Sequence, residues 1–200
     1  MLDKTFDPKK IDSKNYEIEE KLGIFNSDIN SPKKDFCIMM PPPNVTGVLH
    51  MGHALNFTLQ DVIVRYKRLN NFNVLWQPGT DHAGIATQIV VENELNKNNQ
   101  NRYSLGKESF IKKVWEWKKK SGNQIISQMR QLGVSADWAR ERFTMDDALT
   151  KTVRKVFINL FEKKMIFKEK RLINWDIKLQ TAVSDLTPAF DSPPQYLRCR

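Results

Sequence analysis

Two of the three histidines in the chain, His50 and His53, stand three residues apart in the segment 41–57, PPPNVTGVLHMGHALNF. A turn follows the prolines, and the His-x-Gly-His sequence then opens a segment with helical spacing. The first N–H groups of a helix have no partner within it, and the helix dipole places partial positive charge there. Imidazole N–H groups on one face of that turn can donate to phosphate oxygens. The pattern therefore predicts a phosphate site whose histidines stabilise charge that develops in a transition state.

Two glycines accompany the histidines. Gly47 is expected to permit the tight turn before the helix, because glycine adopts backbone conformations that other residues avoid. Gly52 stands between the histidines and has no side chain, so a flat base can approach the backbone there.

Other interpretations of the histidine pair stay open at this point. Histidines at this spacing can form half of a zinc site, but zinc needs three or four ligands, and the sequence offers only His82 and Cys37 as additions. The histidines can also be solvent-exposed or capping residues without a chemical role. We expect no metal at this position.

The predicted elements around these residues alternate between strands and helices. Short apolar runs that end at proline predict buried strands over 35–41 (DFCIMMP) and 73–79 (NVLWQPG), and RLINW at 171–175 can form a third. Helical spacing predicts helices over residues 8–24, 50–69, 85–95, 104–132 and 146–164. This alternation is typical of an α/β domain with a parallel sheet.

Three of these helices carry apolar residues on one side, which is the side that normally packs inward. In 50–69 they are Leu55, Leu59, Val62, Ile63 and Tyr66. In 104–132 they are Phe110, Ile111, Val114, Trp115, Ile125, Ile126, Met129 and Leu132, and in 146–164 they are Leu149, Val153, Val156, Phe157, Leu160 and Phe161. We expect Gly122 to bend or break its helix, and we expect core positions for Trp115, Trp117 and Trp138.

Composition narrows the class of protein. A hydrophobic content of 40% and five tryptophans suffice for a core. The two cysteines lie far apart, which suits a reducing compartment, and no apolar run approaches the roughly 20 residues that cross a bilayer. The first residues, MLDKTFDPKK, lack the apolar segment of a signal peptide, so we expect a cytoplasmic protein without a membrane partner. A net charge of +9 favours polyanion partners, although a coding bias toward lysine gives the same balance.

Four stretches of the chain resemble a known family. PPPNVTGVLHMGH is similar to the HIGH signature of class I aminoacyl-tRNA synthetases. GTDHAGIATQ (79–88), DWARERFTMD (137–146) and NWDIKLQTAVSDL (174–186) resemble the valine-specific members of that family. The resemblance implies the first half of a Rossmann-like catalytic domain over 36–186, with parallel strands and long helices. A helical extension over 1–35 would precede it, and an irregular tail over 187–200 would follow.

The resemblance also implies roles for individual residues. His50 and His53 would contact the ATP phosphates while the aminoacyl-adenylate forms. Gly47 and Gly52 would bind the nucleotide, with Gly52 under the adenine.

An amino-acid site is implied beside the nucleotide. Asn44 and Asp81 would hold the α-amino group, which suits a carboxylate facing an ammonium. Pro41 and Pro42 would shape the wall for a small branched side chain, and His82 would line the same pocket. Asp81 alone also fits a helix cap in GTDHAG.

The implied reaction activates valine with ATP, which carries Mg²⁺, and transfers the valyl group to tRNA(Val). The complete enzyme would be a monomer. Several parts that the family carries are absent from the sequence: the KMSKS loop, the editing insertion and the anticodon-binding domain. The proline that the family usually has at Ile177 is missing too.

We therefore expect a truncated N-terminal portion that is inactive alone. The alternatives are a non-catalytic ATP-binding or split-enzyme fragment, and another HxGH nucleotidyltransferase. The latter is disfavoured because segments 79–88 and 137–146 have no place in it.

Overall fold

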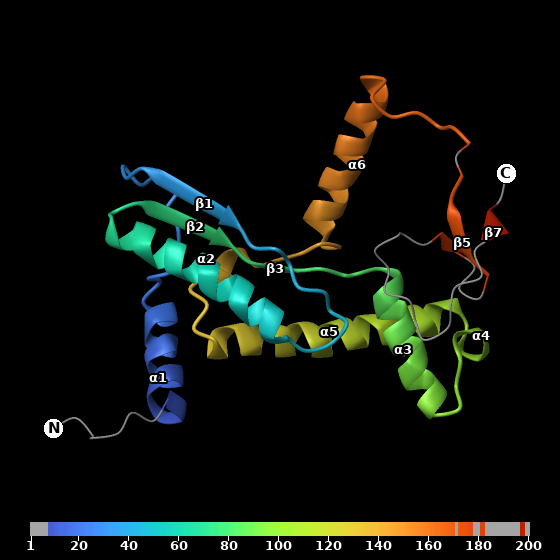
Figure 1. Cartoon of the computed structure of the whole chain (residues 1–200), viewed down its shortest axis with the longest axis horizontal. Helices are drawn as coiled ribbons and strands as arrows, with labels where there is room; N and C mark the ends of the chain where they lie inside the picture. The colour runs from blue at the N-terminus through green and yellow to red at the C-terminus, as the bar shows by residue number, and fades with distance from the viewer. Residues whose placement is uncertain (1–7, 171, 178–180, 183–196, 199–200) are drawn as a thin grey trace. The chain divides into compact units, whose positions relative to one another are not determined.

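The computed structural model describes residues 8–170, 172–177, 181–182 and 197–198 (Figure 1). The chain divides into two compact units, Met1–Thr152 and Val153–Arg200. The first unit contains both histidines of the His-x-Gly-His sequence and all the other predicted site residues.

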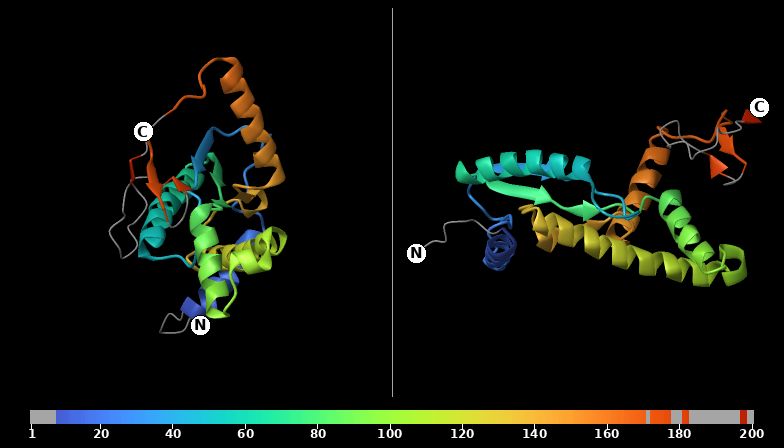
Figure 2. Two further views of the ribbon diagram at one scale, coloured as in Figure 1. Left: turned by 90° about the vertical axis from the view of Figure 1, so that its right-hand side faces the viewer. Right: turned by 60° about the horizontal axis from the view of Figure 1, so that its bottom comes forward.

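A strand–helix–strand unit forms the centre of the first unit. Strand β1 (Asp35–Met39) pairs in parallel with β2 (Asn73–Gln77), and helix α2 (Met51–Leu69) connects them. Helix α2 runs along the strand pair and packs against it (Figures 1 and 2). The predicted parallel α/β arrangement is confirmed.

The three prolines interrupt the pairing of these strands. The Met40 N–H still donates to the Gln77 carbonyl oxygen at 3.1 Å. Residues 41–43 have no N–H to donate, and pairing resumes only where Asn44 lies opposite Asp81 in a parallel bridge.

The register changes across this interruption. Met39 lies opposite Gln77, whereas Asn44 lies opposite Asp81. The first strand therefore uses one residue more than the second over the same length, as in a β-bulge. This extra residue sets which side chains stand opposite one another beyond the prolines.

A second pair of parallel strands lies beyond β2, and one of its strands follows β2 directly in the chain. Strand β3 (Gly79–Thr80) pairs with β4 (Arg142–Phe143), which follows the 3₁₀ turn η1 (Trp138–Arg140). A Cβ at Gly79 would stand 2.9 Å from the Arg142 carbonyl oxygen, so only glycine permits this close pairing.

The remaining helices of this unit match the predicted ones with shifted ends. They are α1 (Pro8–Lys21), α3 (Ile85–Lys97), the single turn α4 (Arg102–Leu105) and α5 (Lys107–Gln131), while α6 (Asp147–Glu162) crosses the boundary between the units. The expected break at Gly122 is wrong, because α5 is continuous through that residue. Gly106, at φ 77°, separates α4 from α5 instead.

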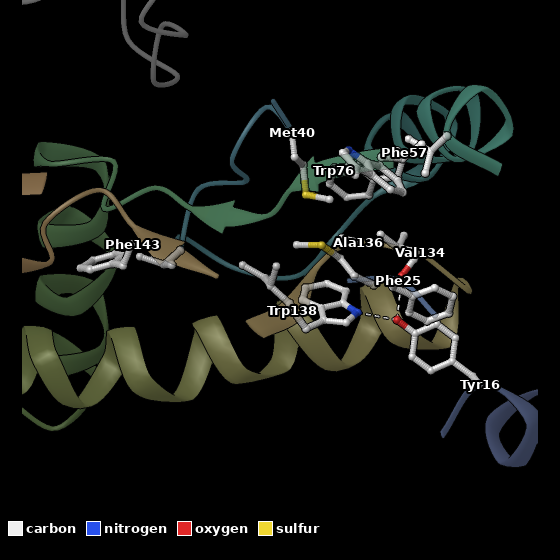
Figure 3. Close-up of a cluster of buried hydrophobic side chains, with 14 residues drawn as sticks. Tyr16, Phe25, Met40, Phe57, Trp76, Val134, Ala136, Trp138 and Phe143 are labelled. Carbon is white, nitrogen blue, oxygen red and sulfur yellow. Dashed lines mark hydrogen bonds between the residues drawn. The ribbon is translucent and has the colours of Figure 1, made fainter. Parts of the chain in front are cut away.

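A buried apolar cluster lies between β2 and α5 (Figure 3). Trp76, Ile125 and Met129 are fully buried in it. Tyr16 of α1 joins the cluster, and its hydroxyl donates to the Val134 carbonyl oxygen at 2.7 Å and accepts from Trp138 Nε1 at 2.5 Å. Burial raises the pKa of Tyr16 to about 12, so the hydroxyl remains a donor over the physiological range.

Several expected core positions are wrong. β1 is not a buried strand, since Cys37 is exposed and Met39 is 71% exposed. No residue of α6 is buried. Helices α2 and α6 both expose apolar residues that were expected to face inward. They include Leu55, Leu59, Val62, Ile63 and Tyr66 in α2, and Val153, Val156, Phe157 and Phe161 in α6. In α5 the exposed ones are Ile111 and Trp115, and Leu132, the residue that follows this helix, is exposed too.

The physical reason is that amphipathic spacing identifies an apolar side but does not say what covers it. Within the residues that the structure describes, nothing covers these sides of α2 and α6. Trp138 is buried as expected, and Trp117 is half-buried.

The second unit contains a small antiparallel sheet. Strand β5 (Asn174–Asp176) lies between β6 (Thr181–Ala182) and β7 (Leu197–Arg198). The expected strand at 171–175 is therefore displaced, and it is antiparallel because it joins this separate sheet. The expected irregular tail falls outside the described residues except at β7, which is a strand.

The predicted domain limits at residues 35 and 186 stay predictions. Among the residues with described placement, no helix combines the length and the apolar character that crossing a membrane requires.

Candidate functional site

His50 and His53 cap helix α2 reciprocally. His50 is the N-cap residue, and its extended backbone (φ −123°, ψ 173°) turns its ring over the first helical turn. Nδ1 of His50 accepts from the Gly52 N–H at 3.1 Å, and Nδ1 of His53 accepts from the His50 N–H at 3.2 Å. The capping interpretation that the sequence left open is therefore correct, and the cap occupies only one nitrogen of each ring.

The cap decides where the ring protons are. A neutral imidazole carries one proton, so a ring whose Nδ1 accepts must be protonated at Nε2. The two ring centroids lie 3.9 Å apart. Burial, followed by the neighbouring charge of His50, lowers the pKa of His53, which favours its neutral form. The pair thus presents two Nε2–H donors at the positive end of a helix dipole, an arrangement suited to phosphate oxygens.

The two glycines differ in what they contribute. A Cβ at Gly52 would stand 2.9 Å from Cε1 of His50 and 3.0 Å from its Nδ1, so the missing side chain makes room for the capping ring. A Cβ at Gly47 would meet nothing within 4 Å, and Gly47 is not among the positive-φ residues. The turn therefore does not need glycine at position 47.

Helix α5 holds the turn that leads into His50. Three of its side chains bond to the backbone of residues 45–49. They are Trp117 Nε1 to the Val45 carbonyl oxygen (2.8 Å), Ser121 Oγ to that of Gly47 (3.1 Å), and Gln128 Oε1, which accepts from the Leu49 N–H (3.0 Å). Sequence reasoning missed Ser121 and Gln128 and gave Trp117 a core role only. The available signal was their spacing of four and seven residues, which places them on one helix face.

Asn44 and Asp81 lie side by side at the carboxyl ends of β1 and β2. Their bridge is closed by the Asp81 N–H to the Pro43 carbonyl oxygen at 2.8 Å. Asn44, Pro41 and Pro42 are exposed, and the Asp81 side chain is 32% exposed. The carboxyl ends of adjacent parallel strands meet at one edge of a sheet, which is where ligands bind in such folds.

His82 and Thr144 complete the group around Asp81. Thr144 Oγ1 lies 2.9 Å from Asp81 Oδ1, 2.9 Å from the His82 backbone nitrogen and 2.6 Å from His82 Nδ1. Buried Thr87 donates to the His82 carbonyl oxygen at 2.7 Å. Sequence reasoning missed Thr144, although it lies within the quoted segment 137–146.

The zinc interpretation gains no support from this geometry. The Nδ1 atoms of His50 and His53 already accept from backbone amides. Across the described part of the chain, no group of three His, Cys, Asp or Glu side chains is placed to hold a metal ion.

Comparisons with known proteins agree on one family. The model of the tRNA synthetases of class I (I, L, M and V) matches residues 14–191. The valine–tRNA ligase of Gluconobacter oxydans (strain 621H) is 54% identical over 186 residues, which cover 93% of this chain and 21% of that protein. The valine–tRNA ligase of Acinetobacter baylyi (strain ATCC 33305 / BD413 / ADP1) is 56% identical over 182 residues, which cover 91% of this chain and 18% of that protein. The chain thus spans about a fifth of the length of these relatives.

A solved structure shares the fold. It is the ternary complex of Agrobacterium radiobacter K84 LeuRS with tRNA and LeuAMS, with a TM-score of 0.73 and 24% identity over 90% of this chain and 21% of that one. Since the family model covers most of the chain and the fold agrees with it, the chain belongs to the tRNA synthetases of class I (I, L, M and V).

Proposed function

We propose that the chain provides the ATP and valine sites of a valine–tRNA ligase. The observation that carries the proposal is the reciprocal histidine cap, which leaves two Nε2–H donors at the start of α2. The identity of 54% to 56% with proteins named valine–tRNA ligase supplies the choice of amino acid.

The reaction has two steps. The valine carboxylate attacks the α-phosphorus of ATP in line, and pyrophosphate leaves with the Mg²⁺ that entered on the nucleotide. A ribose hydroxyl at the 3′ end of tRNA(Val) then attacks the carbonyl carbon of valyl-adenylate and releases AMP. No side-chain nucleophile is needed, so positioning and charge stabilisation account for the catalysis.

His50 and His53 stabilise the negative charge that builds on the phosphate oxygens. Their rings are fixed by the cap before substrate arrives, so little reorganisation is needed in the transition state. Gly47 and Gly52 belong to the same nucleotide site, and the exposed backbone at Gly52 can meet the flat face of adenine.

Asp81 and Asn44 bind the ammonium group of valine. Oδ1 of Asp81 is the oxygen that accepts from Thr144. The other oxygen, Oδ2, makes no hydrogen bond to any residue of the described chain. A free carboxylate oxygen beside an exposed amide suits an ammonium group. Pro41 and Pro42 would form the wall for the branched side chain, and His82 would line the pocket.

A second candidate is a split or non-catalytic ATP-binding fragment. It is favoured by the exposed apolar side of α2, which nothing among the described residues covers. In that case the site is complete only when further protein is present.

Valine-dependent ATP–pyrophosphate exchange tests these proposals. It would be measured for the chain itself and for a chimera in which the chain replaces the matching segment of the Gluconobacter oxydans relative. Exchange by the chimera with valine, exceeding that with isoleucine, supports the ligase site. Exchange by the chimera alone, and not by the chain, identifies the chain as an incomplete site. A folded chimera that shows no valine-dependent exchange contradicts the ligase proposal.

A further inference from the structure

Thr144 lies at the centre of the group formed with Asp81 and His82. Its hydroxyl is within 2.9 Å of a carboxylate oxygen, a backbone nitrogen and an imidazole nitrogen. We infer that Thr144 is a positioning residue of the amino-acid site, whose hydroxyl orients the Asp81 carboxylate and fixes the His82 proton on Nδ1. This inference rests on the proposed function for its ligand, but its geometry stands without it.

Counting protons gives a single consistent arrangement. A threonine hydroxyl has one proton to donate and two lone pairs that accept. The His82 backbone N–H donates to Oγ1, which uses one lone pair. An ionised carboxylate can only accept, so the hydroxyl proton goes to Asp81 Oδ1 at 2.9 Å. The second lone pair of Oγ1 then accepts from His82 Nδ1 at 2.6 Å, which must carry a proton.

The opposite arrangement fails on the same distances. If the hydroxyl donated to His82 Nδ1, no proton would lie between Oγ1 and Asp81 Oδ1. His82 Nδ1 is also 3.3 Å from that carboxylate oxygen, so two lone pairs would face each other there as well. Protonation of Nδ1 satisfies both contacts, since one N–H lies between two oxygens.

The arrangement leaves two acceptors for a ligand. A neutral ring protonated at Nδ1 has a bare lone pair on Nε2, and this atom has no hydrogen-bond partner within the described ranges. Oδ2 of Asp81 is likewise unbonded there. An ammonium group carries three donors, so a carboxylate oxygen and an imidazole nitrogen together match the amino end of a free amino acid better than either alone.

His82 therefore differs in kind from the other two histidines. His50 and His53 accept at Nδ1 and donate at Nε2, which suits an anion. His82 donates at Nδ1 and accepts at Nε2, which suits a cation. The two ends of the site use opposite tautomers of the same side chain for opposite ligand charges.

Nitrogen-15 NMR of the 200-residue chain tests the tautomers directly. With ¹⁵N-labelled histidine, at a pH where the rings are neutral, the shifts of Nδ1 and Nε2 separate protonated from bare nitrogens. We expect two rings protonated at Nε2 and one at Nδ1, and the Nδ1 form should disappear in His82→Asn. Three Nε2-protonated rings would overturn the inference.

Thr144 variants test the positioning role. Thr144→Val removes the hydroxyl at nearly constant shape, and the His82 ring should then lose its uniform Nδ1 form. Thr144→Ser keeps the hydroxyl and should restore it. Thr152→Val is the matched control, because that hydroxyl bonds only to the Ala148 carbonyl within α6. If the His82 tautomer is unchanged in a folded Thr144→Val chain, the contact with Asp81 alone keeps the proton on Nδ1. That result would overturn the role of Thr144.

The chimera adds a functional readout. Thr144→Val should raise the KM for valine by about tenfold to a hundredfold, the scale of losing a hydrogen bond to a charged group, with the KM for ATP unchanged. Thr144→Ser should return the KM for valine close to its original value. A fall in kcat with an unchanged KM for valine would overturn the assignment. A chimera inactive before any substitution would instead contradict the proposed function, while the tautomer spectra would still test Thr144.

Discussion

At the scale of single residues, the histidine pair combines two tasks that are normally separate. One nitrogen of each ring terminates a helix, and the other remains available to a ligand. The fold thereby fixes both the orientation and the protonation of the two imidazole donors. A histidine elsewhere in a helix would have neither constraint.

The first prediction separates the cap from the chemistry. His50→Asn keeps a side chain that caps helices well but removes the imidazole donor. In the chimera it should slow adenylate formation by about 2 to 4 kcal/mol, the usual scale for one such donor, while the KM for ATP changes less. Pre-steady-state kinetics of adenylate formation would measure this.

Comparison with His50→Ala gives the control for that prediction. The alanine variant should lose the same activity and, in addition, helix stability of about 1 kcal/mol, because the N-cap is gone. A His50→Asn chimera with normal adenylate formation and a raised KM for ATP would show that the ring acts on bound nucleotide only.

The second prediction concerns the charge state of His53. Burial lowers its pKa, and the charge of His50 lowers it further, below the ordinary value of 6.5. His50→Asn removes only the second cause, so the pKa of His53 should rise part of the way back. Histidine proton resonances followed against pH would report this in the chain itself.

The same shift has a consequence for stability. Because the folded state disfavours protonated His53, its contribution is fully present above the unfolded value of 6.5 and declines as the pH falls below it. Denaturant unfolding of the chain should show this decline, and it should be smaller in His50→Asn. An equal decline in both proteins would mean that the charge of His50 is not involved.

At the scale of elements, the position of the histidines depends on α5. Three side chains of that helix bind the turn at residues 45–49, and the cap begins directly after it. The apolar cluster beneath holds α5 against β2 (Figure 3). Helix α5 therefore supports the candidate site from behind. None of its residues is predicted to contact a ligand.

The third prediction tests this support. Gln128→Met removes the acceptor for the Leu49 N–H at similar side-chain length. The loss of about 1 to 2 kcal/mol of local stability should speed exchange of the Leu49 amide by about 5-fold to 30-fold. Hydrogen exchange followed by NMR would measure it.

Gln131→Met is the matched control for this experiment. Gln131 is exposed at the end of the same helix and makes no side-chain hydrogen bond to another described residue. Exchange at Leu49 should be unchanged in this variant. Equal acceleration in both variants would point to general fraying of α5 rather than to loss of the anchor.

The sequence predicted the helices and strands better than the side-chain contacts that hold them in place. Strand–helix–strand alternation follows from the period of apolar residues, and a helix start at His50 follows from the turn before it. The spacing of Ser121 and Gln128 places them on one helix face but does not identify them as anchors, because a polar residue on a helix looks the same whether it meets water or a backbone group. Thr144 was missed for the same reason.

The register of the paired strands was also not predictable from the sequence alone. The parallel partners of β1 could be expected from topology, but the extra residue at 41–43 depends on how the prolines divide the ladder. Placing Asn44 beside Asp81 therefore came from the family resemblance and not from strand periodicity. The sequence assigned Gly52 to the nucleotide site because it has no side chain, and the structure gives that side-chain position to the His50 ring.

At the scale of the whole molecule, apolar surface decides how the chain behaves in solution. The exposed side of α2 and the exposed residues of β1 leave large hydrophobic side chains in water; they include Leu55, Leu59, Val62, Ile63 and Met39. Exposed apolar surface of this kind promotes association. β1 also pairs on one side only among the described residues, which leaves backbone donors and acceptors available at its other edge.

The fourth prediction follows from that surface. The purified chain should associate as its concentration rises, and light scattering should show a mean mass above the 23.4 kDa of the monomer. Leu59→Lys should lower the association, because it places a charge within the exposed side of α2. Gln131→Lys, at an exposed position outside that side, adds the same single charge and is the control for a change in net charge. A monodisperse monomer at all concentrations would disprove the prediction.

The one-residue register change at residues 41–43 makes the site sensitive to length more than to composition. Side chains alternate between the two faces of a strand, so a shift of one residue moves each of them to the opposite face. Replacing a proline there with another small residue keeps Asn44 opposite Asp81. Deleting one proline would remove the extra residue and leave Asn44 opposite Asp81 in a register without a bulge, whereas inserting one residue would carry Asn44 past Asp81 and onto the opposite face of the strand. Among natural or engineered variants of this segment, substitutions and the loss of one proline should therefore be tolerated where insertions are not.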